Sequence, residues 1–162
     1  MKRNSKGFTL IELLIVVAII GIIVAIAIPN LLNAIQRAKQ RRTMGDIRSI
    51  ATAVEAYAVD TNRYPPGAGV TFPSGMTYPG VSLAAKAALY ISPTYIRVAP
   101  LADGWNSWFL YSTDGNGSAY FLASFAKNGT TDNINSGPTT DFNADIIYVN
   151  GQFIQYPEGI QQ

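Results

Sequence analysis

The chain has 162 residues with 12 basic and 10 acidic side chains, and it contains neither cysteine nor histidine. Its length leaves room for one modest soluble domain beyond an apolar N-terminal segment. Without cysteine there are no disulfides, thiolate metal sites or thiol nucleophiles, and without histidine the most common general base and metal ligand is missing. The composition therefore excludes most familiar catalytic sites.

The first expected element is a membrane helix. No charged or polar side chain occurs between Leu13 and Ile28. With the flank from Phe8, this run has the length that spans the hydrocarbon of a bilayer, about 20 residues. The preceding residues 2–6 include three basic side chains and no acid. The positive-inside bias therefore places the N-terminus in the cytoplasm and sends the rest of the chain outward.

One acidic residue, Glu12, lies in this apolar run. A formal charge in the middle of a bilayer costs about 2.5 to 3.5 kcal/mol on insertion scales, so such an acid usually has a partner and a function. The residues alone leave two interpretations open. Glu12 is either a first-turn acid that is favoured by the helix dipole and reaches the interface, or an acid with a specific partner.

The helical pattern continues through residues 31–62, which contain no proline and many good helix formers. An unbroken helix from Phe8 to Val59 would be about 78 Å long. Gly21 and Pro29 predict a kink within it. In the second half, apolar residues recur at steps of three and four, which predicts an amphipathic helix with one face on a core. These residues are Ile47, Ile50, Ala51, Val54, Tyr57 and Ala58.

Charge is distributed unevenly along the chain. Residues 37–48 contain five basic and one acidic side chain, whereas four basic and eight acidic side chains follow residue 48. The basic stretch could bind lipid headgroups, nucleic acid or the acidic groups of another protein, or it could be a solvated helix face. Because it lacks interleaved aromatic residues, no nucleic-acid partner is expected.

Residues 63–162 are predicted to form a globular head. Proline and glycine are dense in residues 63–80, which predicts a loop, and residues 81–92 allow one short helix. Short runs of aromatic and β-branched residues at 106–113, 118–126 and 144–153 predict a small antiparallel sheet. The expected fold class is α+β, with the C-terminal half of a long N-terminal helix packed on this sheet. The aromatic side chains are expected to fill the core between them.

The stretch KGFTLIELLIVVAIIGIIVAIAIPN, residues 6–30, resembles the prepilin leader and helix of type IV pilins and type II secretion pseudopilins. The resemblance implies that a prepilin peptidase cuts between Gly7 and Phe8 and methylates the new amine of Phe8. It also implies a division into a leader (1–7), a transmembrane and filament-core helix (8–30), an amphipathic continuation (31–62) and a pilin-like head (63–162).

The resemblance further implies a role for Glu12. In the family, this carboxylate is thought to meet the Phe8 amine of a neighbouring copy in the membrane, and the subunits then assemble into a helical filament. The implied partners are other copies of the chain, the peptidase, inner-membrane assembly platform proteins and minor pilins or pseudopilins. The implied location is the bacterial inner membrane, as a single-pass protein with a periplasmic head, and later a periplasmic or extracellular filament.

Two stretches resemble the major pseudopilin of type II secretion, DTNRYPP and PLADGWNSWFLYSTDGNGSAYFLASFA. The absence of cysteine from this chain also fits that resemblance. In that protein a calcium ion holds the loop before the last strand. Here the corresponding loop offers Asp132, Asp141 and Asp145 as candidate calcium ligands. Its spacing is not that of an EF-hand, and polar loops are common without metal. A calcium site and a metal-free loop both remain open.

The predicted function is a structural, non-enzymatic filament subunit, with the major pseudopilin favoured over a major or minor type IV pilus subunit for adhesion, motility or DNA uptake. Two other classes remain as alternatives, a membrane-anchored carbohydrate-binding domain and a secreted hydrolase using carboxylates. An ordinary signal peptide cut after Ala27 is a further alternative. Against that cut, the helical periodicity continues through the site and the apolar run contains Glu12.

Overall fold

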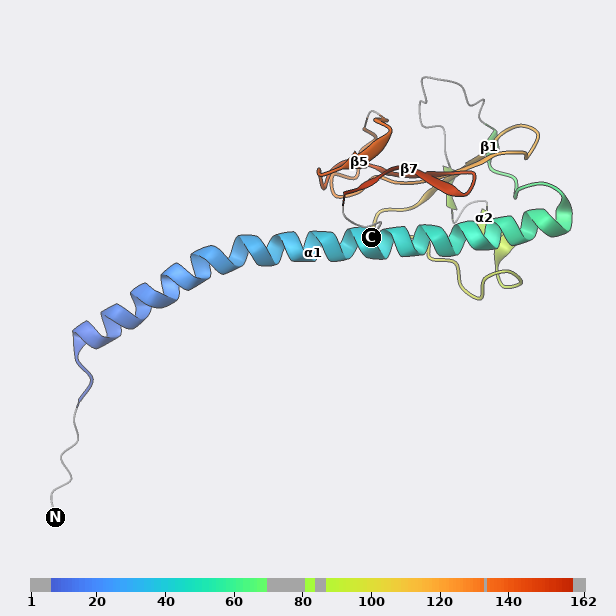
Figure 1. Cartoon of the computed structure of the whole chain (residues 1–162). Coiled ribbons are helices and arrows are strands. Elements are labelled where there is room, and N and C mark those ends of the chain that lie inside the picture. Colours follow the sequence, from blue (N-terminus) through green and yellow to red (C-terminus); the bar gives the residue numbers. More distant parts are fainter. Residues whose placement is uncertain (1–6, 70–80, 84–86, 133, 159–162) are drawn as a thin grey trace, which may run out of the picture. The chain divides into compact units, whose positions relative to one another are not determined.

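The computed structural model describes residues 7–69, 81–83, 87–132 and 134–158, and the chain divides into two compact units, Met1–Arg37 and Ala38–Gln162. The helix α1 (Leu10–Thr61) contributes to both units (Figure 1). The sequence predicted another kind of division, with boundaries at residues 7, 30 and 62 between segments of different function. That division stays a prediction.

Helix α1 is continuous over the range that the sequence predicted, including Gly21 and Pro29. Asn62 follows it with a φ of 57°, the left-handed conformation that commonly ends a helix. The predicted apolar stripe faces the core, because its first four members are buried and Tyr57 and Ala58 are half-buried. The other buried residues of this helix are Gln40, Thr43, Met44 and Ala53.

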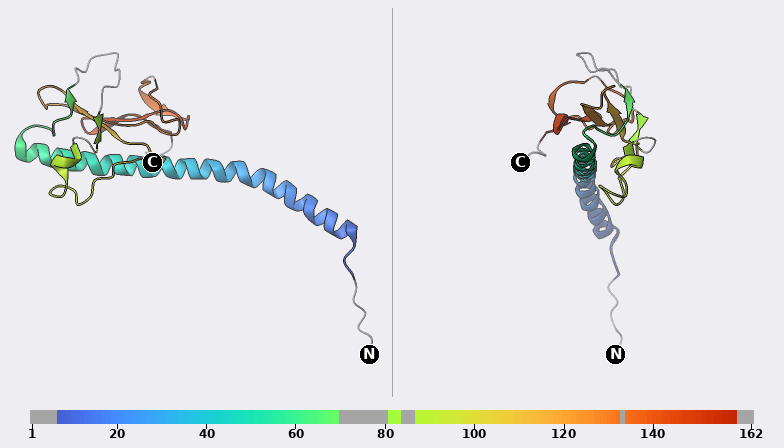
Figure 2. Two further views of the ribbon diagram at one scale, coloured as in Figure 1. Left: turned by 180° about the vertical axis from the view of Figure 1, so that it is seen from behind. Right: turned by 90° about the vertical axis from the view of Figure 1, so that its right-hand side faces the viewer.

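The head adds a short helix, α2 (Ala87–Ile91), and seven strands among the described residues. The predicted helix in residues 81–92 is confirmed only at its end, since its first two residues form a strand and residues 84–86 lie outside the described residues. In chain order the strands are β1 (Ala68–Gly69), β2 (Val81–Ser82), β3 (Leu110–Thr113), β4 (Tyr120–Ser124), β5 (Gly137–Thr139), β6 (Ile146–Val149) and β7 (Gln152–Pro157). They lie on one side of the C-terminal half of α1 (Figure 2).

The strands form one mixed sheet with the order β1-β3-β4-β6-β7-β5, and β2 also pairs with β3. The central pairs β3–β4, β4–β6 and β6–β7 are antiparallel, as predicted. The two outer pairs β1–β3 and β5–β7 are parallel. Parallel pairing requires a long connection, and here the partners are joined by chain segments that contain other strands. The α+β class is confirmed, with a mixed rather than a purely antiparallel sheet.

The predicted run at residues 144–153 is two strands joined by a hairpin turn. Asn150 and Gly151 have φ values of 46° and 92°, and positive values at both positions are typical of the tight turn that Asn-Gly favours. The side-chain oxygen of Asn150, Oδ1, accepts a hydrogen bond from the Tyr120 backbone N–H at 2.8 Å. The hairpin therefore places β7 beside β6 and ties the turn to β4.

The core lies between α1 and one face of the sheet. Ile47, Ile50 and Val54 pack against side chains of β3, β4 and β6, among them Tyr111 and Tyr120. The Tyr120 hydroxyl donates to Glu55 Oε1 at 2.6 Å. Burial raises the pKa of Tyr120, and the Glu55 carboxylate raises it further, so this hydroxyl stays protonated and keeps donating.

The prediction that aromatic side chains fill the core holds for most of them. Phe109, Tyr111, Tyr120 and Phe121 are buried, and Tyr57, Tyr64 and Trp105 are partly buried against the core. Trp108 differs, because 57% of its surface is exposed. It lies just before β3, where it pairs with Ala102 in an isolated bridge.

Candidate assembly site

The start of α1 is held by reciprocal hydrogen bonds between Thr9 and Glu12. The Thr9 N–H and hydroxyl both donate to Glu12 Oε2, at 2.9 and 2.7 Å. In return, the Glu12 N–H donates to the Thr9 hydroxyl oxygen at 3.3 Å. This arrangement is a capping box, in which the residue before the helix and the third helical residue satisfy each other's free N–H groups. Glu12 therefore has a partner within its own chain.

The residues before this cap, Gly7 and Phe8, lie outside the helix and are exposed. A Cβ built on Gly7 meets no atom within 4 Å, and 75% of the Phe8 surface is accessible. The predicted cleavage bond between them is therefore accessible in the described chain. Cleavage and methylation themselves stay predictions.

From Leu13 to Ile28 the helix of the first unit carries only apolar side chains on all sides. Each large apolar side chain from Leu10 to Ile35 is exposed by between 42% and 88% in the single chain. By length and composition α1 is suited to cross a membrane, and its most apolar window has a mean hydropathy of 3.2. Such a surface needs lipid or other helices around it rather than water. Within the described part of this unit, Glu12 is the only acidic side chain.

The predicted kink at Gly21 and Pro29 does not interrupt the helix, since both residues belong to α1. Gly21 leaves open space where a side chain would be, because a built Cβ meets nothing within 4 Å. A bend at these residues stays a prediction.

The three predicted calcium ligands are used differently in the structure. Asp132 Oδ2 accepts from Asn128 Nδ2 at 2.9 Å, and Asp141 Oδ1 accepts from the Asn143 N–H at 2.9 Å. Asp145 is buried, and its Oδ2 accepts from the Asp132 N–H at 3.0 Å. No group of three or more acidic side chains in the described residues is placed to hold a metal ion. Calcium therefore stays a prediction from resemblance.

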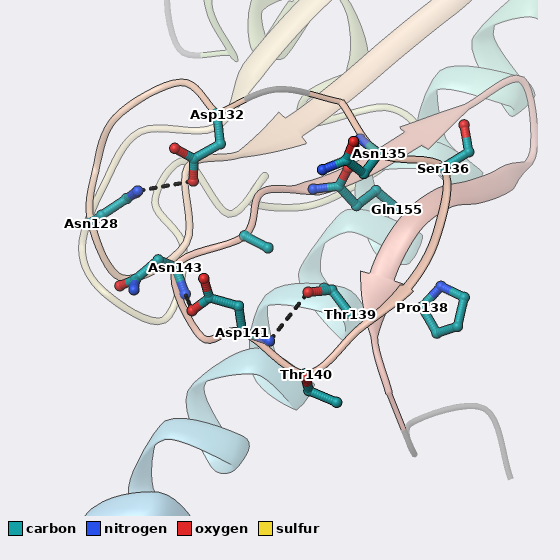
Figure 3. A pocket seen from close by; sticks show the side chains of 11 residues that line it. Asn128, Asp132, Asn135, Ser136, Pro138, Thr139, Thr140, Asp141, Asn143 and Gln155 are labelled. Atoms are coloured by element: carbon teal, nitrogen blue, oxygen red, sulfur yellow. Dashed lines mark hydrogen bonds between the residues drawn. The ribbon is translucent and has the colours of Figure 1, made fainter.

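Asp132 and Asp141 instead line an open hollow of about 860 Å³ beside β5 (Figure 3). Its other labelled side chains are amides, hydroxyls and a proline: Asn128, Asn135, Ser136, Pro138, Thr139, Thr140, Asn143 and Gln155. Hydrogen bonds within the loop account for several of the polar atoms. Asp141 N–H donates to Thr139 Oγ1 at 3.2 Å, and Asn135 N–H donates to Gln155 Oε1 at 2.7 Å.

The calcium prediction has a direct test. If the resemblance holds, adding calcium to the full-length protein in detergent raises its melting temperature, because an ion that binds only the folded chain stabilises it. A chelator reverses the rise, and Asp132→Asn abolishes it. A melting temperature that does not respond to calcium would remove the metal from the account.

Sequence reasoning missed Thr9, although a threonine followed three residues later by glutamate and an apolar run is the pattern of a capping box. It also missed the contact of Arg48 with Phe153, where the guanidinium carbon lies 5.3 Å from the ring centroid. That contact depends on the β6–β7 hairpin, and no short sequence pattern around Arg48 or Phe153 indicates it.

Comparison with protein families identifies the chain. Residues 2–28 match the prokaryotic N-terminal methylation motif, and residues 30–147 match the model of type II secretion system protein G. The chain belongs to the type II secretion system protein G family. Its long N-terminal helix and small mixed sheet agree with the pilin-like fold that the sequence predicted.

Similar proteins are named either as core protein G of a type II secretion system or as subunits of a type IV pilus. The chain is 30% identical to the type II secretion system core protein G of Escherichia coli over 78% of its own length and 84% of that protein. It is 31% identical to the core protein G of Pseudomonas aeruginosa, over 82% and 92% of the two chains. It is 33% identical to the major component of the type IV wide pilus of Thermus thermophilus, over 75% and 82%. No solved structure gives a significant match.

These comparisons confirm the predicted family and the class of function. The protein is a structural filament subunit of the pilin and pseudopilin type. The family favours this function over a carbohydrate-binding domain or a hydrolase, and it implies filament assembly through membrane machinery.

Proposed function

We propose that this protein is the major subunit of a type II secretion pseudopilus, cleaved between Gly7 and Phe8 and methylated on Phe8. One observation supports this most strongly. A single carboxylate, Glu12, lies in the first turn of α1, in the N-terminal stretch from Leu10 to Ile28, which is otherwise apolar and exposed. A helix of this kind is suited to a bundle of identical helices in which the carboxylate has a charged partner.

Cleavage after Gly7 creates a positive amine on Phe8, one residue before the helix cap. The N-terminal end of a helix is itself positive, so the amine gains from a carboxylate nearby. The carboxylate comes from Glu12 of an incoming copy and meets the Phe8 amine of its neighbour. The low dielectric of the membrane strengthens this ion pair. In this bond both donor and acceptor carry a charge, whereas in the bonds from Thr9 only the carboxylate does, so the pair with the amine is stronger. Thr9 thus makes the lone carboxylate tolerable in a single chain until a neighbour offers a better donor.

The remainder of the helix supports packing in the filament. On assembly the apolar side chains exchange lipid for other helices, so the gain must come from close contact. Small residues allow that approach, and they recur along the span at Ala18, Gly21, Ala25 and Ala27. Their spacing supports a tightly packed helical core around the filament axis.

The partners and location follow from the same proposal. Before assembly the chain spans the bacterial inner membrane once, with its N-terminus in the cytoplasm and its head in the periplasm. A prepilin peptidase processes it, and inner-membrane platform proteins and minor pseudopilins build the filament with further copies. The role is structural and not catalytic, and no nucleic acid is required.

The mature N-terminus tests this proposal. We expect mass spectrometry of protein made in a bacterium with its prepilin peptidase to find a chain that begins with methylated Phe8, and electron microscopy to find filaments. A chain beginning at Ile28 would support an ordinary signal peptide instead. An intact Met1 without polymer would support a fixed membrane anchor, and either result would overturn the proposal.

A type IV pilus subunit is the second candidate, because the Thermus relative is the major component of a type IV wide pilus. Filament length in electron micrographs separates the two. Long surface filaments at native expression would favour the pilus, and short filaments confined to the envelope would favour the pseudopilus.

A further inference from the structure

A second charged site lies on the head, where the β6–β7 hairpin meets α1. Arg48 on α1 is exposed, and its guanidinium lies over the Phe153 ring at 5.3 Å from the centroid. Together with Thr52, Gln152 and Tyr156 it lines an open hollow of about 530 Å³. This hollow is called the Arg48 pocket below.

Arg48 is the only cationic residue that lines the Arg48 pocket among the described residues. Contact with an aromatic face positions a guanidinium while leaving its N–H edge available to an anion. No ion pair of Arg48 occurs in the described residues, where the one salt bridge joins Arg42 to Asp46 at 3.5 Å. Glu55, seven residues further along α1, accepts from the Tyr120 hydroxyl. The Glu55 carboxylate also lies near Gly151 of the pocket, 3.6 Å from an ideal Cβ there, but no ion pair joins it to Arg48 in the described residues. The pocket thus presents a positioned cation that makes no direct ion pair in the described part of its own chain.

The position of Arg48 argues against a lipid phosphate as that anion. Arg48 is twenty residues beyond Ile28, which corresponds to about 30 Å along a helix. The headgroup layer on one side of a bilayer is only about 5 to 8 Å thick. An anion from protein therefore fits the pocket better.

The head of the same chain offers such anions. Residues 63–162 contain six acidic and four basic side chains, and the exposed acids among them include Asp141 and Glu158. Asp141 lines the hollow beside β5, which is separate from the Arg48 pocket. A contact between two different surfaces of identical chains is heterologous, and such contacts build an open helical polymer when the rotation between copies does not close a ring. The two separate surfaces are thus compatible with a filament.

We propose that the Arg48 pocket binds a head carboxylate of a second copy and forms a repeated ion pair between heads in the filament. This inference rests on the proposed filament function. The bidentate geometry of a guanidinium with a carboxylate would set the register between neighbouring heads. This ion pair would lie in a different part of the molecule from the pair formed by Glu12.

The first test compares Arg48→Ala with Arg41→Ala in the full-length chain. Arg41 is also exposed on α1 but does not line the pocket. Close charge pairs at interfaces contribute about 1.5 kcal/mol or more, so we expect Arg48→Ala to lower filament yield at least about tenfold relative to Arg41→Ala. Equal yields from the two variants would overturn the inference.

The second test identifies the carboxylate. Arg48→Lys introduces an amine that a carbodiimide can join to a contacting carboxylate, in filaments mixed from ¹⁴N- and ¹⁵N-labelled copies. We expect mass spectrometry to find position 48 linked to an acid of the other isotopic copy. Arg42→Lys is the internal control, because Asp46 lies beside it in the same chain. A link from position 48 only to its own chain or to another protein, or no link while the control reacts, would contradict the inference.

The outcomes separate this inference from the proposed function. If the unaltered chain builds no filament, the proposed function fails. If it builds filaments with methylated Phe8 and Arg48→Ala behaves as Arg41→Ala, only the ion pair at the Arg48 pocket is wrong. If Arg48→Lys assembles poorly by itself, it is mixed as a minor component with the unaltered chain, and the same link from position 48 to the other isotopic copy is expected.

Discussion

Replacing Glu12 with leucine is expected to abolish filaments while cleavage after Gly7 continues. The peptidase bond lies outside the helix and does not involve the carboxylate, whereas assembly leaves each Phe8 ammonium without its partner. Breaking a buried ion pair by removing one member costs about 3 to 5 kcal/mol, which lowers each assembly step at least about a hundredfold. Sheared filament yield and electron microscopy measure the loss, and mass spectrometry of the mature N-terminus checks processing.

Two matched variants separate the charge of Glu12 from its role in the capping box. Glu12→Gln keeps a side-chain oxygen that can accept from the Thr9 N–H and hydroxyl, so the helix start is retained. It lacks the charge, and we expect it to fail in assembly as Glu12→Leu does. Thr9→Val removes the hydroxyl at a helix cap, which costs about 0.5 to 2 kcal/mol but leaves the carboxylate, so filaments should still form. Normal filaments with Glu12→Gln would show that capping rather than charge matters.

Replacing Gly104 with alanine is expected to destabilise the head by about 3 kcal/mol, the upper part of the range for overpacking. A Cβ at this position would lie 2.6 Å from the Lys39 carbonyl oxygen and 2.9 Å from the Lys39 Cα. Both are backbone atoms of α1, so they cannot move as a flexible side chain would. Gly104 N–H also donates to Thr43 Oγ1 at 2.9 Å, and a shifted loop would lose that bond.

The loop around Gly104 has little freedom to adjust. Asp103 is buried, and its Oδ1 accepts from the N–H groups of Trp105 and Ser107, both at 2.9 Å. Its Oδ2 accepts from the Ser124 hydroxyl on β4 at 2.6 Å. The loop is thus fixed to the sheet on one side and to α1 on the other. Strain at Gly104 therefore reaches the contact between helix and sheet.

Urea unfolding of the full-length protein in detergent, followed by tryptophan fluorescence, measures this effect. Gly115→Ala is the control, since a Cβ there meets nothing within 4 Å and surface changes of this kind stay within about 0.5 kcal/mol. If Gly104→Ala unfolds at the same urea concentration as Gly115→Ala, the described approach of the loop to Lys39 is wrong.

The helix and the centre of the sheet were predictable because local patterns specify them. The spacing of Ile47, Ile50 and Val54 marks a buried face whatever covers it, and all three are buried. The Asn150–Gly151 turn and the capping pattern of Thr9 with Glu12 were also present in the sequence. They were missed because the surrounding runs were interpreted as single elements.

The edges of the sheet could not be predicted in the same way. Strands β1 and β2 have two residues each, and both pair with β3 through registers that only the folded head provides. Acidic residues in a loop are likewise ambiguous, since the Asp145 carboxylate accepts from the Asp132 N–H and an oxygen of the same kind can bind an ion. Residue types alone do not separate these two arrangements, because hydrogen bonds to N–H groups and metal coordination use the same oxygens.

The central claim is that Glu12 of one copy pairs with the Phe8 amine of another. Solid-state NMR of filaments mixed from two labelled copies measures it most directly, with ¹⁵N on the Phe8 amine of one copy and ¹³C on the Glu12 carboxylate of the other. The account predicts a dipolar coupling between copies that corresponds to an N···O separation within about 4 Å. Intact filaments without that coupling would contradict it.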